Sequence, residues 1–75
     1  MFLYDSNRGI ALNLDQCIEM RDIQGDVRVD FPEDISYTVV GFSLLNIINC
    51  ISGGRELLTC DSIQPVYKKA FTGPR

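Results

Sequence analysis

The chain has 75 residues, of which 45% are hydrophobic and 23% are charged, and its formal net charge is −3. This composition is too apolar for a disordered chain, and a chain of this length forms one small domain with a limited core. The negative net charge argues against general nucleic-acid binding, which requires cations against the phosphates.

The first part of the chain carries the two-residue periodicity of β-strands. Phe2–Tyr4 is a short apolar run, and Asn7 and Gly9 behind it tolerate the positive φ of a tight turn. From residue 10 to residue 21 the even positions are mainly apolar and the odd ones mainly polar, which is typical of a half-buried strand. We expect a bend or bulge at Asp15-Gln16, where the alternation is weakest.

Two further strands are predicted before residue 41. Residues 27–31 and residues 35–39 each alternate apolar and polar side chains. Gln24-Gly25-Asp26 supplies the preceding turn, and Pro32 ends the first of these strands because it lacks a backbone donor. The connections are short, so neighbouring strands should pair antiparallel as a meander.

A helix is predicted for residues 43–52. Its apolar residues recur at the spacing of one helix face: Leu44, Ile47, Ile48 and Ile51. Ser43 suits the N-cap position, and Gly53-Gly54 suits the end of the helix. Leu45 lies off this stripe, which hints at a second contact surface.

Residues 55–71 are open to two interpretations, a strand or a short helix. Glu56–Cys60 fits either one. Asp61 as N-cap, with Pro65 in the first turn, favours a short helix near Ser62–Phe71. Residues 72–75 are expected to form a flexible tail.

Together these elements predict an α+β fold, a small antiparallel meander of three to five strands with the helix packed on one face. We expect a single domain over residues 1–75, strand-rich over 1–40. The expected core residues are Leu12, Leu14, Ile18, Val27, Val29, Phe31, Tyr37, Val39, Leu44, Ile47, Ile48 and Ile51.

The residues that usually carry chemistry are sparse. There is no histidine, which removes the side chain most often used for proton transfer near neutral pH. The three cysteines, Cys17, Cys50 and Cys60, form no Cys-x-x-Cys motif, so burial is a better interpretation than metal binding. We therefore expect no enzyme activity, catalytic residue, cofactor or metal.

Several features favour the cytoplasm. An odd number of cysteines suggests no disulfide framework. The start of the chain lacks the basic region of a signal peptide. The longest apolar stretch, Val39–Ile51, is too short and too polar to span a membrane, so we expect no membrane partner.

Charge is unevenly distributed along the chain. Residues 1–34 have a net charge of −5, and residues 35–75 have a net charge of +2. We therefore expect a non-enzymatic interaction or regulatory protein that acts through protein–protein contact as a homo-oligomer, with the homodimer as our expectation, or with another protein. The residues proposed for its interaction surface are Leu45, Tyr67, Lys68, Lys69 and Phe71.

Two alternative functions remain open. The first is a nucleic-acid-binding module that combines Tyr37 on a sheet face with Arg28, Lys68 and Lys69. The second is a metal- or thiol-dependent protein that uses Cys50 or Cys60.

Overall fold

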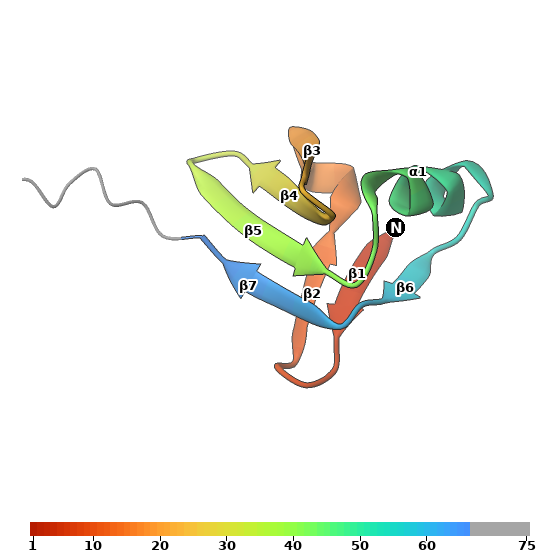
Figure 1. Ribbon diagram of the computed structural model, residues 1–75, viewed down its shortest axis with the longest axis horizontal. Coiled ribbons are helices and arrows are strands. Elements are labelled where there is room, and N and C mark those ends of the chain that lie inside the picture. The colour runs from red at the N-terminus through yellow and green to blue at the C-terminus, as the bar shows by residue number, and fades with distance from the viewer. Residues whose placement is uncertain (67–75) are drawn as a thin grey trace, which may run out of the picture.

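The computed structural model describes residues 1–66 (Figure 1). Its strands are β1 (Phe2–Asp5), β2 (Ile10–Asn13), β3 (Glu19–Ile23), β4 (Asp26–Phe31), β5 (Ile35–Val40), β6 (Leu57–Thr59) and β7 (Ser62–Pro65). Its helices are the 3₁₀ helix η1 (Leu14–Gln16) and the α-helix α1 (Leu44–Ser52).

The described strands form two sheets. One has three strands in the order β2-β1-β6, and the other has four strands in the order β3-β4-β5-β7. β1 pairs antiparallel with β2 and parallel with β6, whereas every pair in the larger sheet is antiparallel. Helix α1 packs against β3. The predicted α+β class is confirmed, although the strands are more numerous than the three to five expected.

η1 divides the long alternating segment into two strands that belong to different sheets. The side chain of Asn13 accepts the backbone N–H of Asp15 at 3.0 Å and so starts the turn. This is the position at which the sequence predicted a bend. Because η1 interrupts the alternation, Ile18 lies outside β3 and is 68% exposed. Its predicted place in the core is therefore wrong.

β7 occupies the segment for which a second helix was predicted. Ser62–Pro65 pairs with β5, with Pro65 opposite Tyr37. β7 is an edge strand, where the missing N–H of proline is tolerated. The helix near Ser62–Phe71 is therefore wrong for residues 62–65, and residues 67–75 lie outside the described residues.

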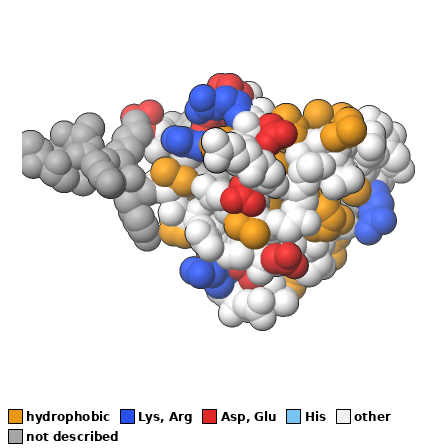
Figure 2. All heavy atoms as spheres, viewed as in Figure 1, with side chains coloured by type: hydrophobic (Ala, Val, Ile, Leu, Met, Phe, Trp, Pro, Cys, Tyr) orange, Lys and Arg blue, Asp and Glu red, His pale blue; other side chains and the backbone are white. Residues whose placement is uncertain are grey.

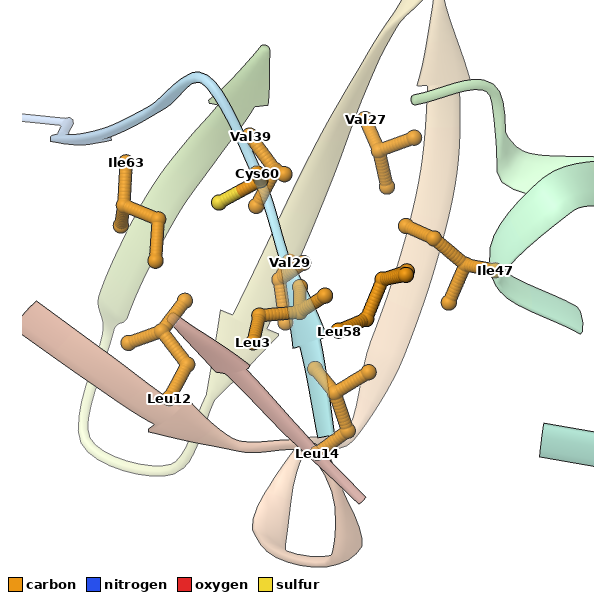
Figure 3. Close-up of a cluster of buried hydrophobic side chains, with 10 residues drawn as sticks. All are labelled: Leu3, Leu12, Leu14, Val27, Val29, Val39, Ile47, Leu58, Cys60 and Ile63. Atoms are coloured by element: carbon orange, nitrogen blue, oxygen red, sulfur yellow. The ribbon is translucent and has the colours of Figure 1, made fainter. Parts of the chain in front are cut away.

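The core is built from both sheets and from α1. Figure 3 shows its side chains pointing toward one another from β1, β2, η1, β4, β5 and α1 and from the β6–β7 region: Leu3, Leu12, Leu14, Val27, Val29, Val39, Ile47, Leu58, Cys60 and Ile63. Phe31, Tyr37 and Leu44 are partly buried against this cluster. The sequence analysis missed three of these core residues, Leu3, Leu58 and Ile63, which belong to short segments with too few alternations to show a period. The burial of Cys60 was expected.

Helix α1 turns only part of its apolar stripe toward the core. Ile47 is fully buried, whereas Ile48 and Ile51 are 44% and 43% exposed. Leu44 and Cys50 pack against the core on either side of Ile47. The buried face is therefore the i, i+3, i+6 line through Ile47, and the predicted burial of Ile48 and Ile51 is wrong.

Both ends of α1 follow the sequence signals. The Ser43 hydroxyl accepts the N–H of Asn46 at 3.2 Å, and the Asn46 side chain accepts the N–H of Ser43 at 3.4 Å. This reciprocal capping satisfies donors that the first turn leaves free. Gly53 is the C-cap, as expected.

The turn between β3 and β4 provides a test of local backbone strain. Gln24 and Gly25 both have positive φ, 50° and 99°, and Ile23 pairs with Asp26 across them. Asparagine adopts this conformation more readily than glutamine. We expect Gln24→Asn to raise the free energy of unfolding by about 0.5 kcal/mol in urea titrations. A decrease would show that the Gln24 side chain contributes a favourable contact.

Candidate protein-docking surface

The exposed side of α1 carries an apolar surface. Leu45 is 64% exposed, and it lies on the same side of the helix as the half-exposed Ile48 and Ile51. We call these three residues the apolar helix face. No residue of α1 is charged, although a solvated helix usually carries charges on its outer side.

Further hydrophobic side chains lie on the neighbouring sheet. Phe2 and Leu57 are opposite each other in the parallel β1–β6 pair, and both are exposed. Opposite residues of a ladder project to the same side, so these two form one apolar area on the outer side of the three-stranded sheet. Figure 2 shows hydrophobic side chains gathered at the end of the molecule that holds α1 and β6. Exposed apolar side chains gathered at one end of a molecule are typical of interaction sites.

A hollow of about 490 Å³ flanks the other side of α1. Asn46, Asn49 and Cys50 line it, and Arg55 supplies a positive charge. At Gly41, where φ is +110°, an added Cβ would lie 2.8 Å from the Asp61 carboxyl carbon. This close approach leaves no room for a side chain at Gly41, shortly before α1 begins.

A second concave feature runs along β2. This β2 groove has a volume of about 430 Å³. Phe31 and Tyr37 form part of its wall, with ring centroids 5.9 Å apart in an edge-to-face arrangement. Residues 11–13 of β2 and Gln16 of η1 line the groove as well, and Pro32, Glu33 and Ile35 complete the lining.

The β2 groove adjoins an acidic hollow. The hollow shares Phe31 and Glu33 with the groove, and its volume is about 320 Å³. Its charged lining consists of four carboxylates and one arginine: Glu19, Asp30, Glu33, Asp34 and Arg28. The excess of carboxylates makes this region attractive to cations.

Asp30 is held in an ion-pair network within that hollow. Its Oδ1 accepts the Ser36 hydroxyl at 2.8 Å and the Arg28 Nε–H at 3.2 Å, and its Oδ2 accepts an Arg21 Nη2–H at 3.4 Å. The Ser36 hydrogen bond, followed by the arginine charges, holds the pKa of Asp30 below its ordinary value, against the opposing effect of burial. Arg28, considered above as a nucleic-acid contact, is thus paired with Asp30.

Asp5 is a fully buried carboxylate with a structural role. Its Oδ2 accepts the N–H of Ile63 at 2.9 Å, and its Oδ1 accepts the N–H groups of Asn7 at 2.9 Å and Arg8 at 3.2 Å. The Ile63 bond makes the largest contribution to lowering the pKa of Asp5, against the opposing effect of burial, and the other two donors add to it. The carboxylate ties the β1–β2 turn to β7.

The cysteines are dispersed as free thiols, with Cys60 buried and Cys17 and Cys50 partly buried. Burial raises the pKa of the Cys17 and Cys60 thiols, which disfavours the reactive thiolate. Residues 1–66 contain no group of three or more cysteine, aspartate or glutamate side chains arranged to hold a metal ion. No helix of this part of the chain is long and apolar enough to cross a membrane.

The predicted interaction residues have different outcomes. Leu45 is exposed on α1, and its role as a contact residue stays a prediction. Tyr67, Lys68, Lys69 and Phe71 lie outside the described residues. Sequence reasoning assigned Ile48 and Ile51 to the core, although the absence of charge throughout α1 signals a second apolar side.

Comparison with protein-family models, with curated proteins and with solved structures finds no match to the chain. Functional inference therefore rests on its own surfaces.

Proposed function

We propose that the chain is a small, non-enzymatic interaction protein of the cytoplasm that associates with a second copy through the apolar helix face. The observation that carries this proposal is the exposure of Leu45, Ile48 and Ile51 on a helix without charged residues. Association would remove this apolar surface from water, which is the main favourable contribution to most protein contacts.

A second copy is the partner that this surface fits best. In a twofold contact the residues on the symmetry axis meet their own counterparts, so any charge at the centre meets a like charge. The apolar helix face has no charge, and two α1 helices can therefore approach each other without repulsion. Self-association also compensates for the limited core of a chain of this length.

The test is Ile48→Lys, with Ile18→Lys as the matched control. Both isoleucines are exposed in the folded chain, but Ile18 lies between η1 and β3, where it lines the acidic hollow, and no residue of α1 lines that hollow. The symmetric contact loses two buried isoleucines and gains two lysines. We therefore expect the dimer dissociation constant to rise by about 100-fold or more.

Sedimentation velocity over a concentration series measures this change, with circular dichroism as the check on folding. Ile18→Lys should sediment like the wild type. A wild-type chain that stays monomeric at millimolar concentration, or equal effects of the two substitutions, would contradict the proposal.

A further inference from the structure

The β2 groove lies along an open strand edge. β2 pairs with β1 on one side, and no strand of residues 1–66 pairs with it on the other. Residues 11, 12 and 13 all line the groove although successive side chains of a strand point to opposite faces. The groove therefore follows the edge of β2 and not one face of its sheet.

The backbone groups that face this edge can be assigned. The N–H of Leu14 bonds to the carbonyl of Met1 at 2.9 Å, so the Met1–Leu14 pair is a hydrogen-bonded one. Pairs alternate along an antiparallel ladder, and Ala11 and Asn13 belong to the non-hydrogen-bonded pairs with β1. Their N–H and C=O groups point away from β1, toward an incoming strand.

The walls of the groove define the chemistry of that strand. Phe31, Ile35 and Tyr37 offer an apolar and aromatic wall. Glu33 stands at the junction with the acidic hollow, whose carboxylates outnumber its arginine. The groove thus fits an extended segment that combines aromatic side chains with lysine or arginine.

The chain itself contains a segment of this composition. Residues 67–71 read Tyr-Lys-Lys-Ala-Phe, and residues 67–75 carry three positive charges and no acidic side chain. The nine residues beyond Val66 reach up to about 30 Å when extended. Val66 itself bonds through its N–H to the carbonyl of Ser36 at 2.9 Å, beside the groove residues Ile35 and Tyr37.

We infer that the β2 groove binds the C-terminal segment, residues 67–75, of a second copy, which adds to β2 as an extra strand. This inference rests on the proposed self-association and assigns it a second contact. Charge complementarity between Lys68 and Lys69 and the acidic rim orients the segment. Its aromatic side chains pack against Phe31 and Tyr37.

The experiment titrates a fluorescent peptide with the sequence of residues 66–75 into the full-length chain carrying Lys68→Glu and Lys69→Glu. These two substitutions weaken the competing internal copies of the segment. We expect saturable binding, measured by fluorescence anisotropy, that weakens as salt is raised from 50 to 500 mM because the charges are screened. Amide exchange at Ala11 and Asn13 should slow when the peptide is bound.

Glu33→Lys in the same receptor should weaken peptide binding by about tenfold, since an attractive surface pair becomes a repulsive one. Glu56→Lys, the same change at an exposed position outside the groove, is the matched control and should leave it unchanged. Equal effects of the two substitutions, or unchanged exchange at Ala11 and Asn13, would overturn the site.

The source of the segment is tested in the wild-type chain. Protection of Ala11 and Asn13 should be lost on dilution if the segment comes from a second copy. Protection that is independent of concentration would overturn the intermolecular assignment, because it would place the chain's own segment in the groove. Ile48→Lys should leave peptide binding intact, so failure of the α1 dimer and failure of the groove are distinguishable.

Discussion

Ile47→Ala is expected to lower the free energy of unfolding by about 3 kcal/mol. Ile47 is fully buried, and its side chain is the one α1 inserts among core residues of both sheets (Figure 3). A chain of this size has roughly 3–5 kcal/mol of stability in total. The variant should therefore retain only about 0–2 kcal/mol, which leaves from a few per cent to about half of its molecules unfolded, as measured by circular dichroism.

The neighbouring residue supplies the matched control. Ile48→Ala removes the same atoms from the same helix, but from a side chain that is 44% exposed. This substitution should lower the free energy of unfolding by less than about 1 kcal/mol, measured below the concentration at which the chain associates. Equal losses of stability in the Ile47→Ala and Ile48→Ala variants would mean that α1 does not turn Ile47 toward the core.

Asp5→Asn is expected to lower the melting temperature by about 10 °C. Both carboxylate oxygens of Asp5 accept backbone N–H groups, from Ile63 on one side and from Asn7 and Arg8 on the other. An asparagine side chain has only one oxygen, so its NH₂ group must face at least one of these donors. Thermal unfolding measures the loss, with Glu56→Gln as the exposed control. An unchanged melting temperature would show that the carboxylate does not hold the β1–β2 turn to β7.

The acid dependence of stability should follow from the same carboxylate. The folded-state pKa of Asp5 lies below the ordinary value of 3.8, and that of Asp30 is lowered as well. The contributions of these two carboxylates to the free energy of unfolding are fully present well above pH 3.8. They are lost as the pH falls through that value toward the folded-state pKa values. Urea titrations from pH 6 to pH 2.5 should show this decline, and Asp5→Asn should reduce its size. An equally steep decline in the variant would assign the acid sensitivity to other groups.

Local signals in the sequence identified much of the fold. The Asn7–Gly9 turn, the break at Asp15-Gln16 and the start of α1 at Ser43 each depend on residues close together in the chain. Such features are accessible from turn and capping chemistry alone.

Features that depend on contacts between distant parts of the chain could not be predicted from the sequence. The helical interpretation of Ser62–Pro65 followed from Asp61 and Pro65, but pairing with β5 overrides that preference. The burial of Asp5 depends on Ile63, and no periodicity links these two residues.

The candidate docking surface was only partly predictable. Leu45 stood out because it departs from the helical stripe of its neighbours. Ile48 and Ile51 share that stripe with Ile47, and only the rotation of α1 on the sheets decides which of them is buried. The β2 groove combines β2 with the β4–β5 hairpin and is visible only once the two sheets are packed.

The parallel pairing of β1 with β6 has a consequence for synthesis on the ribosome. Phe2–Tyr4 leaves the exit tunnel long before Leu57–Thr59, its partner on that side. Until then the β1–β2 hairpin of the nascent chain has no strand paired with the other edge of β1, and much of the core is exposed to solvent. Contacts between such remote positions slow the search for the native state. Completion of this sheet should therefore be a late step, and chaperones have that interval in which to bind.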